Sequence, residues 1–286
     1  MKKEVYDIQT IDMSRYITLI PFDPATIVPI WVFEKDKKLN LVGEESAIID
    51  YVSGDKTLKQ IKFPWNEKIQ SFDFGEDGSV FLLTKQNHII VPRRDQFAYV
   101  NVTGQNSWEE SLGIKTFNGN IYLLNAQKNQ VERHKPWING FSQKSSIFTK
   151  IQPWILDISI DGGIYLYMED GKILRYTGNP EKLDNITLNK IPGEWNINPT
   201  LWTTFITKGN LSYTYIHNGN RIWIFQPNSK RFQDITSWEY RWQFELKTEE
   251  TIKSIQVPRD GSIYVTTDRW VYELKFEFID GKIIFK

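Results

Sequence analysis

Short apolar stretches alternate with turn residues along the whole chain. In five of these stretches an aromatic residue stands third: Ser79–Thr84, Asn120–Asn125, Gly163–Met168, Leu211–Ile216 and Ser262–Thr267. A weaker copy, Lys38–Gly43, has Asn40 at the aromatic position. From Asn40 onward the third positions lie 41, 41, 43, 48 and 51 residues apart. Stretches this short predict strands, and a period of this size is typical of solenoids and propellers.

Each copy lies in similar surroundings. Candidate first strands precede the aromatic strands at Ile69–Phe74, Ile114–Phe117, Ile155–Ile160, Leu201–Ile206 and Ile252–Val257. Turn residues such as Asn118-Gly119 join the two strands, and they tolerate the positive φ of a tight hairpin. Third strands are predicted at Ile173–Thr177 and Arg221–Phe225. More polar fourth strands, suited to a sheet edge, are predicted at Leu58–Phe63, Phe97–Val102, Arg231–Ile235 and Lys282–Phe285.

Six similar four-stranded units in tandem, with no linker between them, predict an all-β chain. We expect one six-bladed β-propeller domain over residues 1–286, built of four-stranded antiparallel blades. The expected blades are approximately 27–64, 69–103, 114–150, 155–189, 201–236 and 252–286. Residues 1–26 form an N-terminal extension or a closing strand, in which Tyr16–Phe22 adds an edge strand beyond Lys282–Phe285 or covers the seam. A β-sandwich would explain the 41-to-51-residue recurrence only as a coincidence.

Composition and charge narrow the function classes. Aromatic residues make up 14% of the chain, which suits sheets. Lys plus Arg and Asp plus Glu number 35 each, so the basic excess that nucleic-acid binding demands is missing. The chain has no cysteine, which excludes disulfides, thiolate metal sites and a cysteine nucleophile. No apolar stretch approaches the length of a membrane span, and no signal peptide is visible. If the natural chain begins at Met1, the cytoplasm is expected.

Motifs for metal or cofactor chemistry are also missing. His88, His134 and His217 lie far apart and form no metal-binding pair, so a structural or solvated role is expected for them, with no metal tightly held. No glycine-rich phosphate loop occurs. We therefore predict neither a cofactor nor a metal.

The strand motif Gly163–Leu166 resembles the blades of six-bladed propellers of the NHL, low-density-lipoprotein-receptor and lactonase type. More narrowly, Asn120–Arg133, Gly162–Tyr176 and Tyr213–Phe225 are similar to propeller segments found beside PPM-type phosphatase-like domains in predicted bacterial proteins. This resemblance implies the propeller fold. The acidic metal-binding motifs of the phosphatase family are missing, so no catalytic residue carries over.

The resemblance to lactonases implies a specific set of calcium ligands. In those calcium-dependent enzymes a Glu, two Asn and an Asp point into the central channel from four first strands. The predicted first strands here offer only Asp73 and Asp157 as acids, and no Asn. An enzyme of that type is therefore disfavoured.

Tryptophan is the most distinctive residue type, with 11 in the chain. Seven lie in or beside the segments that connect one blade's outer strand to the next blade's inner strand: Trp65, Trp108, Trp154, Trp195, Trp202, Trp238 and Trp242. Such connections gather on one face of a propeller. The seven tryptophans either wedge between blades and shield the core or form an aromatic rim that binds a ligand. The other four, Trp31, Trp137, Trp223 and Trp270, are expected to pack within blades.

These observations predict a non-catalytic binding or scaffolding propeller that presents a Trp-rich loop face to a protein or peptide partner. Two alternatives stay open, a lactonase-like hydrolase and a carbohydrate-binding propeller, each with its site at the channel mouth. Acids and amides that converge on a cation at the axis would favour the hydrolase. Flat, exposed Trp faces would favour the carbohydrate binder.

Overall fold

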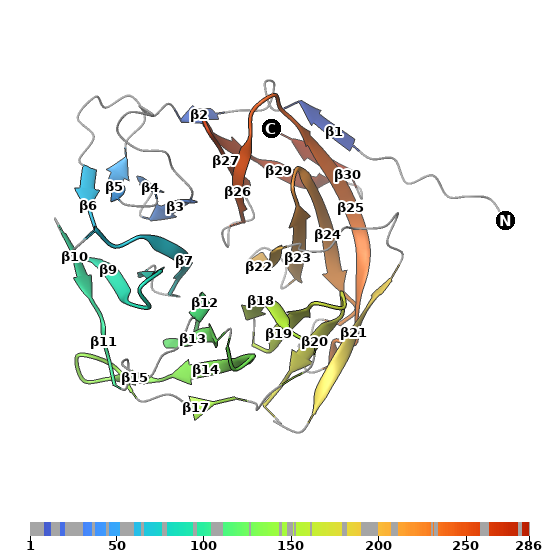
Figure 1. The fold of residues 1–286 in the computed structure, drawn as a ribbon. Helices are drawn as coiled ribbons and strands as arrows, with labels where there is room; N and C mark the ends of the chain where they lie inside the picture. Colours follow the sequence, from blue (N-terminus) through green and yellow to red (C-terminus); the bar gives the residue numbers. More distant parts are fainter. Residues whose placement is uncertain are drawn as a thin grey trace. The chain divides into compact units, whose positions relative to one another are not determined.

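A computed structural model describes most of the chain as β-strands (Figure 1). The described residues are 9–12, 18–20, 31–35, 38–43, 46–51, 60–63, 66–75, 79–93, 96–103, 111–125, 127–142, 145–147, 151, 153–160, 162–178, 182–189, 200–206, 211–229, 231, 234–257, 263–279 and 282–285. Among them, no helix has the length and hydrophobicity that a membrane crossing requires. The chain divides into two compact units, unit 1 (1–24 and 186–286) and unit 2 (25–185).

Unit 2 contains successive antiparallel sheets. The first is β3 (Trp31–Lys35), β4 (Lys38–Val42), β5 (Ser46–Tyr51) and β6 (Gln60–Lys62); the second is β7 (Ile69–Phe74), β8 (Val80–Thr84), β9 (Ile89–Arg93) and β10 (Gln96–Tyr99). The third is β12 (Ser111–Phe117), β13 (Asn120–Asn125), β14 (Gln130–His134) and β17 (Ser145–Ser146); the fourth begins with β18 (Ile155–Ile160), β19 (Ile164–Met168) and β20 (Ile173–Tyr176), followed by β21 (Leu183–Asn189). A small sheet of β11 (Asn101–Val102), β16 (Gly140–Phe141) and β15 (Pro136–Trp137) supplements them.

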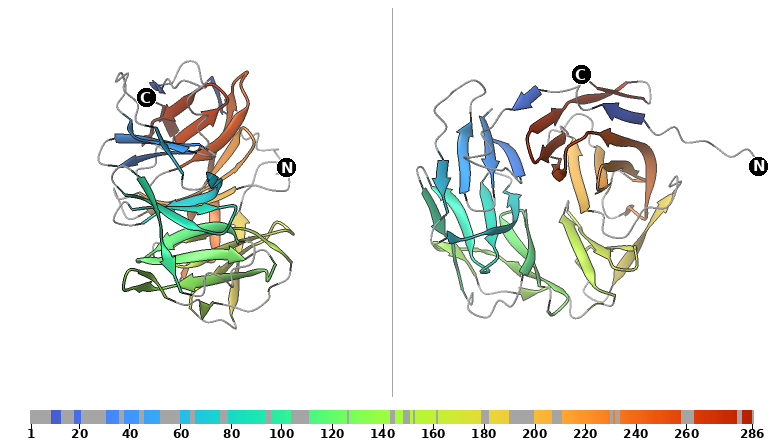
Figure 2. Two further views of the ribbon diagram at one scale, coloured as in Figure 1. Left: turned by 60° about the vertical axis from the view of Figure 1, so that its left-hand side comes forward. Right: turned by 45° about the horizontal axis from the view of Figure 1, so that its top comes forward.

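Unit 1 holds two larger sheets and a hairpin. Four successive neighbours in a nine-stranded sheet are β22 (Thr200–Ile206), β23 (Leu211–Asn218), β24 (Arg221–Pro227) and β25 (Ser237–Lys247). Residues of β21 and of β1 (Gln9–Asp12) pair in parallel with different parts of β25. The last sheet consists of β26 (Ile252–Gln256), β27 (Ile263–Thr267), β28 (Val271–Leu274) and β2 (Thr18–Ile20), and the hairpin of β29 (Phe276–Ile279) and β30 (Lys282–Phe285). Figure 2 shows the two blue N-terminal strands beside the orange and red strands of this unit.

The predicted repeat register is confirmed. Phe81, Tyr122, Tyr165, Tyr213 and Tyr264 all lie on the second strand of their sheets. Their first-strand partners are Asp73, Lys115, Ser159, Thr204 and Gln256. The shared place on the second strand, opposite a polar residue each time, means that the five units follow one template.

A β-bulge recurs in four of these sheets, and the sequence pattern did not reveal it. The register of the first strand shifts between Ile69 and Ser71, Ser111 and Gly113, Ile155 and Asp157, and Ile252 and Ser254. A bulge leaves one residue unpaired and bends the strand. The bend therefore recurs where each first strand begins.

Apolar side chains form the cores between successive sheets. In unit 2, Leu83 and Ile89 of the second sheet pack with Ile121 and Leu123 of the third, and all four are fully buried. In unit 1, β23 and β24 pack against β26 and β27, with Ile224 and Val265 also at zero exposure. Because these clusters are apolar, hydrophobic burial stabilises the stacking of the sheets.

Two outer strands differ from the prediction. The described residues of the range Arg231–Ile235, which are 231, 234 and 235, do not lie in a strand, and the strand that pairs with β24 is the longer β25. Lys282–Phe285 pairs with β29 in a separate hairpin, so the fourth strand beside β28 is β2, from the N-terminus. The N-terminal segment therefore does add an edge strand, although on β28 and not beyond Lys282–Phe285. The short connection from β29 to β30 favours their pairing as a hairpin, whereas the prediction had assumed that Lys282–Phe285 pairs with the third strand of the sheet.

Side chains of unit 2 connect one sheet to the backbone of the next. The Ile114 and Thr116 amides of the third sheet donate to Ser71 Oγ (3.2 Å) and Asp73 Oδ2 (2.5 Å) of the second. Burial raises the pKa of the Asp73 carboxyl, while Lys115 and the Thr116 bonds oppose the rise. Two turn asparagines with positive φ act similarly. Asn87 Oδ1 accepts from the Ser111 amide (3.0 Å) and Asn129 Oδ1 from the Ile155 amide (2.7 Å).

Asn129 is the strongest of these links, since its Nδ2 also donates to the carbonyls of Ile151 and Pro153. Asn129→Gly keeps the positive φ but leaves these buried backbone groups unpaired, so we expect unfolding free energy to fall by about 3 kcal/mol. Asn139→Gly is the matched control, because Asn139 also has a positive φ but is exposed. We expect it to change stability by less than ~0.5 kcal/mol. Equal effects in urea titrations would contradict the role of the Asn129 amide.

Deletion of residues 1–22 removes β1 and β2 and exposes the outer edges of β28 and part of β25. We expect the loss of backbone pairing to lower unfolding free energy by about 2 to 4 kcal/mol and the melting temperature by roughly 5–10 °C. Differential scanning calorimetry measures both. A truncated protein that melts with the parent would show that these strands are dispensable.

Candidate functional site

Four of the seven predicted binding tryptophans yield no side-chain position. Trp65, Trp108 and Trp195 lie outside the described residues. Trp202 lies in β22, where only the backbone is described. Their role in a loop face remains a prediction.

Trp238 and Trp242 are not in a connecting segment. Both belong to β25, an outer strand of 11 residues. Trp238 is 1% exposed and therefore offers no surface to a ligand. Trp242 is partly buried against the core of unit 1, with its ring centroid 6.2 Å from that of Tyr213. For these two, packing is the physical reason for the indole.

Trp154 is exposed, as the loop-face prediction requires. Its side chain is 44% exposed immediately before β18, and Leu112, the bulge residue of the neighbouring β12, is 47% exposed. Asn129 fixes the backbone on both sides of Trp154 through its bonds to Pro153 and Ile155. An apolar pair therefore faces solvent where the first strands of two adjacent sheets begin.

Among the described residues, the apolar side chains with the greatest exposure lie elsewhere, at a position predicted to be blade packing. Trp137 is 66% exposed and Ile138 80%, at the tip of the hairpin formed by β15 and β16, which we call the 136–141 hairpin. Such exposure of a Trp next to an Ile is uncommon unless a surface binds something. The prediction for Trp137 was wrong because hairpin insertion between β14 and β17 interrupts the four-strand template.

Backbone contacts hold the 136–141 hairpin in place. β16 pairs in parallel with β11, and the Thr103 amide donates to the Phe141 carbonyl (3.1 Å). The approach is so close that a Cβ on Gly140 would lie 1.9 Å from the Asn101 carbonyl oxygen. Phe141 anchors the base, with its ring centroid 5.8 Å from that of Phe81. Only glycine fits at position 140.

A cleft of about 580 Å³ opens beside this hairpin, and we call it the hairpin cleft. It is lined by Ser79, Val80, Phe81, Val91, Pro92, Tyr99, Val100, Asn139, Gly140 and Phe141. None of these residues is charged, and Ser79, Tyr99 and Asn139 bring polar groups to the lining. The cleft therefore suits an uncharged ligand that offers hydrogen-bonding groups.

Tyr99 connects the cleft to a buried carboxylate. Its hydroxyl donates to Glu67 Oε1 (2.9 Å), and His88 Nδ1 lies 2.5 Å from the same oxygen. Burial and the contact with Glu67 raise the pKa of Tyr99 to about 12. The phenol therefore stays protonated at neutral pH and remains a donor.

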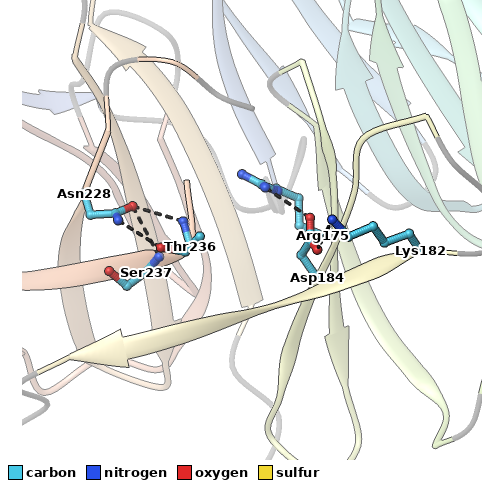
Figure 3. Close-up of polar contacts among 6 residues, drawn as sticks. All are labelled: Arg175, Lys182, Asp184, Asn228, Thr236 and Ser237. Carbon is cyan, nitrogen blue, oxygen red and sulfur yellow. Dashed lines mark hydrogen bonds and ion pairs between the residues drawn. The ribbon is translucent and has the colours of Figure 1, made fainter. Parts of the chain in front are cut away.

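Two other polar clusters have a structural role. Arg175, 2% exposed, pairs with Asp184 (3.3 Å), which also faces Lys182 (3.4 Å) (Figure 3). Figure 3 also shows Asn228 Oδ1 accepting from the Thr236 and Ser237 amides, which positions the start of β25. Within the described part of the chain no three metal-ligating side chains come together.

The first-strand acids are likewise engaged locally. Asp73 bonds to Thr116, and Asp157 Oδ1 accepts from the Ile158 amide (2.8 Å). These contacts occupy the carboxylates that a lactonase-like site would have needed.

Comparison with solved structures identifies the fold. YCF48 bound to the D1 peptide aligns with a TM-score of 0.54 at 9% identity, over 96% of this chain and 98% of that one. YCF48 from Cyanidioschyzon merolae gives 0.53 at 10% identity, over 94% and 95%. A protein from Lactobacillus plantarum gives 0.54 at 12% identity, over 88% and 78%. These neighbours are β-propeller proteins.

The chain has a β-propeller fold. At these identities the likeness concerns the fold alone. No protein-family model and no curated protein sequence matches the chain. The nature of the site therefore depends on its own residues.

Gly140→Ala tests the placement of the hairpin. Because the added methyl group meets the Asn101 backbone, we expect the hairpin to separate from β11, with a loss of about 1 to 3 kcal/mol. Hydrogen exchange at the Thr103 amide should accelerate. Gly113→Ala is the control, since its Cβ would lie 3.8 Å from the nearest atom, Ser71 Oγ. Unchanged Thr103 exchange in Gly140→Ala would refute the close approach.

Proposed function

We propose that this protein is a binding propeller that takes up a segment of a protein partner at the 136–141 hairpin. The exposure of Trp137 and Ile138 beside the hairpin cleft is the observation that carries this proposal. Exposed Trp side chains next to a concave surface are typical binding hot spots. The hairpin is held by backbone pairing on one side and by Phe141 on the other, so the surface is preorganised for binding.

The occupant is an extended, uncharged peptide segment. An uncharged lining would leave a buried ligand charge without a partner, which disfavours acidic or basic segments. Polar atoms in the lining match the amide and carbonyl groups of a peptide backbone. The volume lies in the range of roughly 300–1,000 Å³ that is usual for ligand sites. The structure of YCF48 with the D1 peptide gives a precedent for peptide binding on this fold.

The propeller in this proposal has six blades. The 41-to-51-residue recurrence of the aromatic second strand and the four separate four-stranded sheets support this count. The relation to propellers beside PPM-type phosphatase-like domains rests on the three sequence segments alone and belongs to the same proposal. Trp154 and Leu112 form a second apolar surface that a larger partner would also cover.

Selection from a displayed library of random peptides tests the function. We expect the purified full chain to enrich apolar, uncharged peptides. Isothermal titration with an enriched peptide should then give a Kd at least about tenfold weaker for the Trp137→Ser, Ile138→Ser double variant. Trp154→Ser is the matched control, an exposed indole outside the hairpin, and it should keep the affinity.

Three outcomes would revise the proposal. If Trp154→Ser abolishes binding and the hairpin variant does not, the peptide function stands but its surface is the loop face. If the parent protein enriches no peptide more strongly than the Trp137→Ser, Ile138→Ser variant does, the proposed peptide binding is wrong. If the protein instead binds phosphatidylcholine vesicles through Trp137, the hairpin is a membrane-contacting element and the proposal is overturned.

A further inference from the structure

His88 differs from the other two histidines in its surroundings. His134 is fully buried and its Nδ1 faces the Ser142 carbonyl (2.9 Å). Burial lowers the pKa of His217 to about 4. The side chain of His88 is 41% exposed, whereas its partner Glu67 is 3% exposed. Only His88 thus combines an accessible imidazole with a buried carboxylate.

The hydrogen bond to Glu67 determines the chemistry of the ring. An ionised carboxylate only accepts, so Nδ1 carries the proton and Nε2 carries the lone pair. Tyr99 donates to the same Oε1 and its ring meets the imidazole edge at a centroid distance of 5.0 Å. Glu67 Oε2 is buried and accepts no hydrogen bond from any described residue. The contacts of His88 and Tyr99 with Oε1 therefore hold the Glu67 carboxylate in place, while Oε2 can still accept a hydrogen bond.

The last sheet shows that this turn closes without an imidazole. Thr84 and Thr267 end their second strands, and their amides donate to the carbonyls of His88 and Trp270. Glu250, two residues before β26 as Glu67 is before β7, accepts from the hydroxyls of Thr267 (2.6 Å) and Tyr272 (2.8 Å). Trp270 stands in the place of His88. A Glu two residues before the first strand is thus common to both sheets, whereas the imidazole is present in only one of them.

We propose that His88 is a nucleophile toward activated acyl groups such as aryl esters, with Glu67 as its positioning residue. Nε2 attacks the ester carbonyl carbon, the bond from that carbon to the aryl oxygen breaks, and the phenolate leaves with the electron pair. Water then attacks the carbonyl carbon of the acyl-imidazolium, one proton of this water passes to the released phenolate, the bond from the carbonyl carbon to Nε2 breaks, the carboxylic acid departs, and Nε2 regains its lone pair. Glu67 holds the proton on Nδ1 and stabilises the positive charge that develops on the ring.

Hydrolysis of p-nitrophenyl acetate by the full chain tests this activity. We expect a rate per imidazole at least about tenfold above that of N-acetylhistidine amide at the same pH, because a fixed carboxylate raises imidazole reactivity. His88→Gln should lose this rate and His217→Gln should retain it. Mass spectrometry of the quenched reaction should find the acetyl group on His88.

Glu67→Gln separates positioning from folding. We expect its kcat for the ester to fall about tenfold with KM unchanged, since an amide stabilises the imidazolium that develops in the transition state less than a carboxylate does. Glu67→Asp keeps a carboxylate at this position and provides a second variant if Glu67→Gln melts early; it should retain more of the rate than Glu67→Gln does. A parent rate equal to that of the reference amide, or an unchanged rate in His88→Gln, would overturn the proposal.

Discussion

The separate sheets of unit 2 depend on side chains that reach the backbone of the next sheet. Its second and third sheets share no strand ladder among their described residues, so ladder hydrogen bonds cannot set their relative register. Apolar packing alone tolerates sliding, because hydrophobic burial is non-directional. The bonds from Ser71, Asp73 and Asn87 to amides of β12 supply the missing direction, and Asn129 does the same for β18.

These links also determine what the loops expose. Because Asn129 fixes the chain on both sides of Trp154, that indole faces solvent from a rigid segment. The bulge in β12 turns Leu112 outward at the same end of the adjacent strand. The hairpin at 136–141 obeys a different constraint, since its pairing with β11 depends on the missing side chain at Gly140.

Sequence pattern predicted the inner parts of the sheets and failed at their edges. First and second strands such as β7, β13 and β18 match the predicted bounds because local alternation and a short turn determine them. The pairing of β2 with β28 joins segments more than two hundred residues apart, which no local pattern encodes. Trp238 was misjudged for a related reason. Whether an indole in a long outer strand is buried depends on the strand register, which the composition of the segment does not contain.

The residues proposed for catalysis and for binding lie where individual sheets differ from the repeated pattern. The framework places a Glu before β7 and before β26, and each accepts hydroxyl groups from its own sheet. At one of these positions the turn contributes His88 in place of Trp270, so a structural carboxylate gains an imidazole partner. The 136–141 hairpin is likewise an insertion between β14 and β17 that no other described sheet contains in the same place. Substitutions and insertions at sheet ends leave the cores unchanged, and for that reason a repeated scaffold can acquire different sites at its different sheets.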